Sequence, residues 1–154
     1  MKKIKLTQNK YALIDDEDFE YLNQWKWCYH HSYAIRSKQI DNRKKYFRMH
    51  RELIKVPLGM VIDHINGDSL DNRKENLRAC TVSQNAMNAK IKKDTSSNIK
   101  GIYFFKNENK YKARITINGR SKHLGVFQDI KNAISAYNNA AKEYFKKFAK
   151  LIPT

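Results

Sequence analysis

Alternating apolar and polar positions in the first 60 residues are typical of short β-strands. The candidate strands are rich in aromatic and β-branched side chains, and Asp41-Asn42 between two of them predicts a turn. One short helix is predicted before the break at Pro57-Leu58-Gly59. The pattern therefore predicts a small, mostly antiparallel β scaffold. Its strands are expected at residues 11–14, 25–29, 32–36 and 44–49, and its helix at 51–54.

The next segment combines strands with a helix. An apolar strand at 59–65 leads into a turn and polar loop at 66–76, and a second strand follows at 77–80. Thr81 and Gln84 then have the spacing of a capping box, which marks a helix start. The predicted unit is a strand, a long loop, a strand and a helix that ends at about Lys90.

The last third of the chain predicts a sheet and one long helix. A polar stretch at 92–99 reads as a linker, and strands follow at 101–105, 110–117 and 121–127. Asn118-Gly119 is a type I′ hairpin signal. From Asp129 onward apolar residues recur at helical spacing, so one stripe of the helix is expected to pack on the sheet. The opposite sheet face stays open, basic and partly aromatic.

Composition adds a preference for a polyanionic partner. The 154 residues carry 31 Lys and Arg against 15 Asp and Glu, a net charge of +16. This excess points first to nucleic acid and second to an anionic membrane surface. Residues 1–90 hold 17 basic and 11 acidic side chains (+6), and residues 91–154 hold 14 and 4 (+10). An acidic run at 15–20 is expected to be a solvated turn and helix start.

Several function classes are excluded by what the chain lacks. No apolar run approaches the roughly 20 residues of a membrane span, and the basic start is not followed by a signal-peptide core. Cys28 and Cys80 are too few for a disulfide scaffold or a four-Cys zinc site, so both are expected to be reduced and inert. We therefore expect a cytoplasmic protein without a membrane partner.

Candidate chemistry lies in the strand–loop–strand–helix unit. Asp63 offers a hard anionic ligand, and His64 is the side chain best suited to act as a general base near neutral pH. Asn85, on the first turn of the predicted helix, adds a neutral carbonyl oxygen. Since strand neighbours point to opposite faces, Asp63 is expected to face a metal and His64 the attacking water.

This region closely resembles the HNH homing-type endonucleases, over roughly residues 44–90. The resemblance implies a ββα-metal fold with one divalent ion at the scissile phosphate of DNA. It assigns His64 as the general base and Asn76 as the residue that holds the loop. Asn85 stands where many members have a histidine, and an Asp63 and Asn85 oxygen set favours Mg²⁺ or Mn²⁺. The matching strings are residues 49–54, 61–68, 70–78 and 81–88.

Other polar residues of the region are open to more than one interpretation. Asn88, one helical turn beyond Asn85, is an alternative ligand. His50 either supports the site or contacts phosphate, or only anchors the scaffold. Asn66, Asp68 and Asn72 are expected to cap the turn and the loop.

Residues 100–151 resemble the Apetala-type, or ethylene-response-factor, DNA-binding domain. The resemblance implies a three-stranded antiparallel sheet that lies in the major groove and is backed by one helix. The matching strings are residues 100–103, 111–115, 123–127 and 133–141. The positions implied to contact DNA, together with the basic sheet position Lys112, are Tyr103, Phe105, Lys112, Arg114, Thr116, Ser121 and His123.

The sequence therefore predicts an α+β protein with an HNH nuclease domain at 1–91 (ββα-metal unit about 59–90), a linker at 92–99 and a DNA-binding domain at 100–154. We expect a metal-dependent endonuclease of phage or mobile-element type that acts on double-stranded DNA as a monomer. No small-molecule substrate is expected, and the compartment is the host cytoplasm, bacterial if the gene is phage-borne.

Two other functions remain as alternatives. One is a non-catalytic DNA-binding regulator with a decayed nuclease half, although decay would most easily remove Asp63, His64, Asn76 and Asn85. The other is an RNA-binding protein, which the narrow major groove of A-form RNA disfavours.

Overall fold

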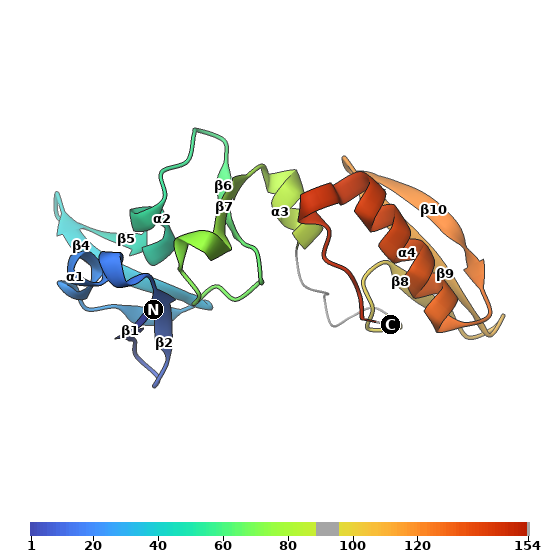
Figure 1. Cartoon of the computed structure of the whole chain (residues 1–154), viewed down its shortest axis with the longest axis horizontal. Coiled ribbons are helices and arrows are strands. Elements are labelled where there is room, and N and C mark those ends of the chain that lie inside the picture. Colours follow the sequence, from blue (N-terminus) through green and yellow to red (C-terminus); the bar gives the residue numbers. More distant parts are fainter. Residues whose placement is uncertain (89–95, 154) are drawn as a thin grey trace. The chain divides into compact units, whose positions relative to one another are not determined.

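The computed structural model describes residues 1–88 and 96–153. The chain divides into two compact units, Met1–Val82 and Ser83–Thr154, which are described separately here. The fold is α+β with small antiparallel sheets, and the C-terminal unit is a three-stranded sheet packed on a long helix (Figure 1). The predicted fold class is confirmed. The predicted domain boundary at 91/92 and the first half of the predicted linker at 92–99 lie outside the described residues.

The N-terminal unit is built on two small antiparallel sheets. β1 (Lys2–Lys5) pairs with β2 (Tyr11–Ile14), and β3 (Cys28–His30), β4 (Tyr33–Ile40) and β5 (Arg43–Arg48) form a sheet in that order. The acidic run forms a 3₁₀ turn, η1 (Asp16–Asp18), and then α1 (Phe19–Asn23), while α2 (Met49–Leu53) follows β5. The buried core is Ile4, Leu6, Ala12, Ile14, Leu22, Trp27, Ala34 and Met49.

Two sequence predictions in this unit need correction. The strand expected at 25–29 begins only at Cys28, because Trp27 is buried and its indole Nε1 donates to the Leu22 carbonyl at 2.8 Å. This bond ties Trp27 to α1 instead of to a strand partner. β1 was not predicted at all, since its lysines hide the alternation of Ile4 and Leu6, which are both buried. The turn at Asp41-Asn42 is confirmed.

The predicted site lies on a two-stranded hairpin in the same unit. β6 (Val61–His64) pairs antiparallel with β7 (Leu77–Cys80), and the loop between them ends in η2 (Lys74–Asn76). α3 follows over Val82–Asn88. The predicted order of strand, loop, strand and helix is therefore confirmed, with the expected helix end at Lys90 outside the described residues.

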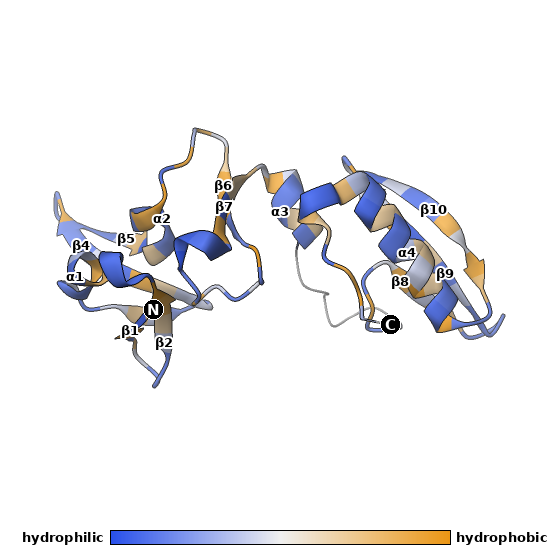
Figure 2. Cartoon of the chain, in the orientation of Figure 1, coloured by the Kyte–Doolittle hydropathy of each residue, from blue (hydrophilic) through white to orange (hydrophobic). Residues whose placement is uncertain are grey.

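The C-terminal unit places one long helix against a sheet. The strand order is β10 (Arg120–Phe127), β9 (Lys110–Ile117), β8 (Ile102–Phe105), and α4 (Ile130–Phe145) packs on it, followed by the 3₁₀ turn η3 (Lys146–Phe148). Asp129 caps α4 as predicted, accepting from the Lys131 N–H at 3.2 Å. Figure 2 shows that α4 carries both hydrophilic and hydrophobic residues. Its buried residues are Ala133, Ile134, Tyr137, Asn138, Ala140, Ala141 and Phe145.

Gly101 is required where the helix approaches the sheet. Its φ is +73°, and a Cβ there would collide with the Tyr137 ring and the Arg114 carbonyl oxygen. The segment after η3 is tied back to α4, because the Asn138 Nδ2 donates to the Ile152 carbonyl at 2.8 Å and the Ile152 N–H donates to the Asn138 Oδ1 at 2.9 Å. Among the described residues, no helix has the length and apolar character to cross a membrane.

Candidate active site

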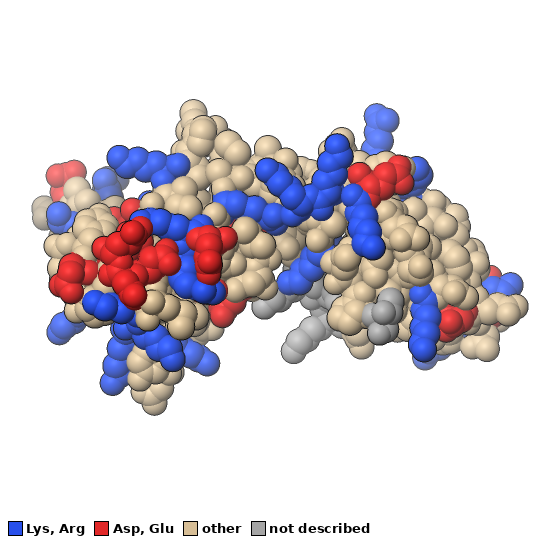
Figure 3. All heavy atoms as spheres, viewed as in Figure 1, with Lys and Arg blue, Asp and Glu red and all other residues tan. Residues whose placement is uncertain are grey.

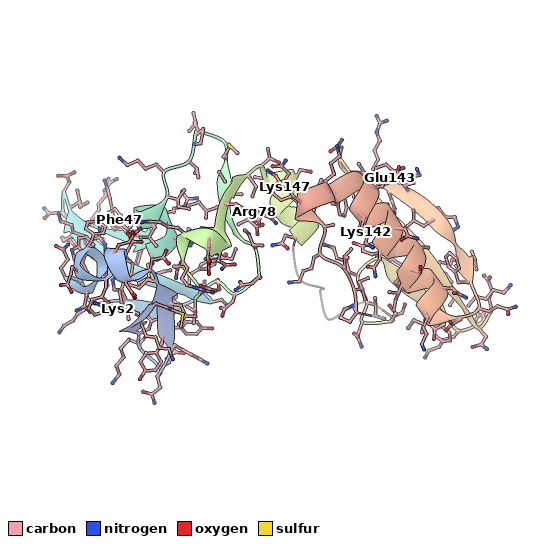
Figure 4. The ribbon with its side chains drawn as sticks, in the orientation of Figure 1. Lys2, Phe47, Arg78, Lys142, Glu143 and Lys147 are labelled. Atoms are coloured by element: carbon pink, nitrogen blue, oxygen red, sulfur yellow. The ribbon has the colours of Figure 1, made fainter. Side chains whose placement is uncertain are left out.

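Asp63 and His64 end strand β6, and both side chains are buried although both are ionisable. They have different partners, as expected for neighbours on a strand. Asp63 pairs with Arg78, its register partner on β7, with 2.7 Å between the Arg78 Nη2 and Asp63 Oδ2 atoms. Figure 4 labels Arg78 on this strand. The His64 ring lies against the rings of His50 and Tyr33, with centroid distances of 5.1 and 6.2 Å.

Asn76 holds the loop between the two strands. Its Oδ1 accepts from the Asn66 N–H at 3.0 Å, and its Nδ2 donates to the Asp71 carbonyl at 2.7 Å. The Ile65 N–H also donates to the Asn76 carbonyl at 2.9 Å. These bonds fix both ends of the loop directly after His64.

The same loop carries its own capping residues. The Asn66 Oδ1 accepts from the Asp68 N–H at 2.8 Å, and the Asp68 Oδ1 accepts from the Leu70 N–H at 3.0 Å. The Asn66 Nδ2 donates to Asp71 at 2.9 Å, and Arg73 pairs with the same carboxylate at 2.7 Å. Turn and loop capping by Asn66 and Asp68 is therefore what the structure shows.

The scaffold of the N-terminal unit fastens this loop from outside. The Leu13 N–H donates to the Leu70 carbonyl and the Asn72 N–H to the Leu13 carbonyl, each at 2.8 Å. Lys74 is held by the acidic run, with ion pairs of 2.5 Å to Glu17 and 2.9 Å to Asp18. Figure 3 shows Asp and Glu side chains gathered on this face of the unit. The acidic run thus stabilises the loop of the site from a distance of over 50 residues in sequence.

Asn72 orients the His64 ring. The Asn72 Nδ2 donates to the Leu70 carbonyl at 3.2 Å, which turns its Oδ1 toward His64 Nε2 at 3.4 Å. An amide oxygen only accepts, so this contact favours the tautomer with the proton on Nε2. Nδ1 then holds the lone pair that a general base needs.

Burial controls the protonation of both histidines. It lowers the pKa of His64, although Asn72 and the nearby carboxylates of Asp63, Asp68 and Asp71 act in the other direction. Burial also lowers the pKa of His50, to about 3, with the neighbouring His64 as the next cause. Both rings are therefore neutral at pH 7, as a proton acceptor must be.

Asn85 and Asn88 belong to the second compact unit and differ in accessibility. Asn85 is exposed on α3, whereas Asn88 is buried. Exposure leaves the Asn85 amide accessible to a ligand and makes it the better candidate of the two.

The donor set suits a hard cation. Within residues 1–88 and 96–153, no cluster of three or more His, Cys, Asp or Glu side chains is arranged to hold a metal. Mg²⁺ needs no such cluster, since it keeps several waters and uses one or two carboxylates together with substrate phosphates. The Asp63 carboxylate and the Asn85 amide each carry oxygen atoms of this chemical type.

The predicted DNA-contacting residues of the C-terminal unit share one sheet face. The cross-strand pairs Tyr103–Lys112, Thr116–Ser121 and Arg114–His123 place them together, opposite the buried Ala113 and Ile115. Cations stack on aromatic rings of this face. The Lys112 Nζ lies 3.8 Å from the Phe105 ring centroid, and the Arg114 Cζ lies 4.1 Å from that of Tyr103.

Sequence reasoning missed three residues that contact the site. Asn72 was expected only to cap the loop, and neither Tyr33 nor Arg78 was considered. Arg78 had a usable signal. If the last residue of the first strand, His64, pairs with the first residue of the second strand, Leu77, then Arg78 lies opposite Asp63. Tyr33 had none, since it lies 31 positions before His64 in the sequence. Both cysteines are free, and Cys80 is buried.

Comparisons with known proteins point to one family. A sequence profile described as HNH endonuclease matches residues 55–87, the span that contains Asp63, His64, Asn76 and Asn85. The chain is 30% identical over 141 residues to a protein of Acanthamoeba polyphaga mimivirus described as an uncharacterized HNH endonuclease, which covers 90% of this chain and 73% of that protein. It is 27% identical over 95 residues to Protein 3.8 of Escherichia phage T7, covering 62% and 78%. No solved structure matches the chain.

Proposed function

Because the chain belongs to the HNH endonuclease family, we propose that it is a metal-dependent DNA endonuclease of homing type whose active site is the end of the β6–β7 hairpin. HNH nucleases generally depend on a divalent metal and act on DNA. The observation that carries the proposal is the neutral, oriented His64 beside the buried carboxylate of Asp63.

His64 acts as the general base. Its Nδ1 accepts a proton from the water that attacks the phosphorus, while Asn72 holds the ring through Nε2. Asn76 positions His64 by fixing the loop that follows it. The rings of Tyr33 and His50 lie beside the His64 ring and limit the positions that it can take.

Asp63 and Asn85 are the residues we propose to hold the divalent ion, Mg²⁺ or Mn²⁺. When bound, such an ion stabilises negative charge on the phosphate and on the leaving 3′ oxygen. Cleavage of the bond between phosphorus and the 3′ oxygen leaves a 5′ phosphate and a 3′ hydroxyl. Asn88 is buried and stays the weaker candidate ligand.

The C-terminal unit is the proposed DNA-binding module, of the Apetala type. Its open sheet face carries Arg and Lys beside aromatic rings, a combination suited to guanine edges, phosphates and bases. Residues 91–154 also hold the larger share of the positive charge, +10 of +16.

Plasmid nicking by the purified full chain tests the proposal. Supercoiled DNA should be cut with Mg²⁺ or Mn²⁺, and EDTA should abolish the cutting. Intact plasmid under all conditions, with DNA binding retained, would instead favour a non-catalytic DNA-binding regulator.

A further inference from the structure

The β4–β5 hairpin projects beyond the core of the N-terminal unit. Every residue from Ser37 to Tyr46 is exposed except the half-buried Ile40. Asp41 and Asn42 both have positive φ, 49° and 56°, as a tight two-residue turn requires. At about 3.3 Å per residue, the free part extends for roughly 15 Å. A two-stranded ribbon without a core on either face is only marginally stable alone.

The hairpin is strongly basic. Between Ser37 and Arg48 the sequence has five basic residues and one acidic residue, Asp41. Lys38 and Lys45 are register partners, and like charges directly opposite each other destabilise a strand pair. In the described part of the chain, no ion pair involves any of the five. They are Lys38, Arg43, Lys44, Lys45 and Arg48.

Acidic side chains of the same unit are engaged elsewhere. Asp16 pairs with the N-terminal amine at 2.6 Å, and Glu17 and Asp18 pair with Lys74. Glu52 pairs with Arg36 at 3.1 Å, at the root of the hairpin. Within the described residues, the cations of the free part therefore have no ion-pair partner, which favours an external polyanion.

Cations lie on both faces of the ribbon. Strand alternation puts Lys44 and Arg48 on one face with Tyr46, and Lys38, Arg43 and Lys45 on the other. The second face is covered at its root, where the Arg36 Cζ lies 4.6 Å from the ring centroid of Phe47, which is labelled in Figure 4. A ribbon charged on both faces suits a groove between two phosphate backbones better than a flat surface, and the major groove of B-DNA admits such a ribbon.

The first face leads to the active site. The Arg48 guanidinium lies 4.6 Å from the Tyr33 ring centroid, and the Tyr33 ring is 6.2 Å from that of His64. A shallow groove of about 350 Å³ crosses this face, lined by His30, His31, Ile35, Tyr46 and Arg48. The stacked rings of His30 and His31 form its wall at the β3–β4 turn.

We propose that the β4–β5 hairpin is a second DNA-binding element, which enters the major groove and holds the phosphate backbone next to His64. The proposal rests on the proposed function and adds a contact to it: the nuclease unit grips DNA itself and does not depend only on the C-terminal sheet. Tyr46, 67% exposed, supplies an aromatic surface beside the cations.

The test measures DNA binding by the full chain in EDTA, where no cutting occurs. The first variant carries Arg43→Gln, Lys44→Gln and Lys45→Gln, all exposed, so that folding is preserved. A matched control removes the same charge from the β1–β2 hairpin with Lys3→Gln, Lys5→Gln and Lys10→Gln. Titrations of a double-stranded oligonucleotide at several salt concentrations give the affinity and its salt dependence.

The hairpin variant should bind about 10-fold or more weakly near 0.1 M salt. The slope of log K against log salt should flatten by about 2.7, at about 0.9 for each lost phosphate contact. The affinity and the salt slope of the control variant should both change much less. Equal losses in the two variants would mean that only net charge matters and would overturn the proposal.

A second measurement locates the contact. Backbone amides of residues 37–46 should exchange hydrogen more slowly when the oligonucleotide is bound to the full chain, and unchanged exchange there would contradict the proposal. Tighter binding of double-stranded RNA of the same length would overturn the choice of DNA. Because both measurements are made in EDTA, they test the hairpin whether or not the parent protein cuts plasmid.

Discussion

Arg78 holds the carboxylate of Asp63 across the β6–β7 hairpin, with 2.8 Å from Nε and 2.7 Å from Nη2 to the same Oδ2 atom. Both side chains are mostly buried, 16% and 6% exposed. The arginine balances the charge that burial makes costly. It also keeps the carboxylate in place as a proposed metal ligand.

Replacing Arg78 by Gln should therefore destabilise the N-terminal unit and increase the stabilisation that this unit gains from a bound metal ion. Removing one partner of a buried pair costs roughly 3–5 kcal/mol, and less is expected here because Arg78 is partly exposed. A bound cation would then replace the lost guanidinium charge beside Asp63. Thermal unfolding with and without Mn²⁺ should show a larger shift in midpoint for Arg78→Gln than for the parent. An additional Asp63→Asn should abolish that shift; a shift that persists would place the ion elsewhere.

Removal of the His64 imidazole should cost most of the cutting rate. His64→Ala is expected to cut ~10²–10⁴-fold more slowly while binding DNA as the parent does. Because burial lowers the pKa of His64 below its usual 6.5, the neutral base should persist into mildly acidic solution. The rate of the parent should rise with pH and level off below pH 6.5. A rate that still rises above pH 7 would mean that another group is the base.

His50 should make the nuclease unit sensitive to acid. Its pKa is about 3 in the folded protein and near 6.5 when unfolded, so between these values the unfolded state binds more protons and stability falls as pH falls. From pH 6.5 to pH 5 the loss is roughly 1–2 kcal/mol for this one group, and His64 adds to it in the same direction. Urea unfolding followed by the fluorescence of Trp25 and Trp27 measures it. His50→Gln should flatten the pH dependence, and an unchanged slope would assign the loss to other groups.

Asn76→Ala should damage stability and activity together. It removes the acceptor for the Asn66 N–H, in a part-buried bond, and the donor for the Asp71 carbonyl, in a buried bond. Each lost bond with an unsatisfied partner costs about 1–3 kcal/mol. Asn76→Asp keeps the acceptor. Its free energy of unfolding in urea and its rate of plasmid nicking should both lie between those of the parent and of Asn76→Ala. A stable but inactive Asn76→Ala would place Asn76 in contact with the substrate.

Local patterns in the sequence were sufficient for much of the fold. Leu77–Cys80 and Lys110–Ile117 form strands with the predicted limits, because alternation and a hairpin signal are properties of a few neighbouring residues. Asp129 caps α4 for the same reason. At Trp27, which is buried in the core together with the distant residues Ile4 and Met49, the local pattern gave the wrong element.

The candidate site shows the same division. Asp63, His64 and Asn76 lie close together in sequence, and the roles proposed for them follow from a motif. Their supporting contacts do not follow from it, since Tyr33, the first residue of β4, lies beside the His64 ring only in the folded chain. Asn72 was predicted to cap the loop, and its contact with the His64 ring depends on the loop path that Leu13 fixes.

Arg114 on the open sheet face should contribute to DNA binding beyond its charge. It is exposed, pairs in register with His123 and stacks on Tyr103 at 4.1 Å, which presents its guanidinium outward in a fixed orientation. Such a group suits bidentate contact with a guanine edge. Arg114→Ala is expected to weaken binding of the preferred site by roughly 1–3 kcal/mol and to reduce discrimination between sequences.

Lys142→Ala provides the matched control for Arg114→Ala. Lys142 is exposed on α4, which covers the opposite face of the sheet, and Figure 4 labels it there. Its loss removes one charge from the same unit without touching the open face, so affinity should change little. Titrations of both variants against a preferred and a scrambled oligonucleotide separate charge from base reading. If the two variants lose affinity equally and on both oligonucleotides, the open face of the C-terminal sheet contributes only general electrostatic attraction.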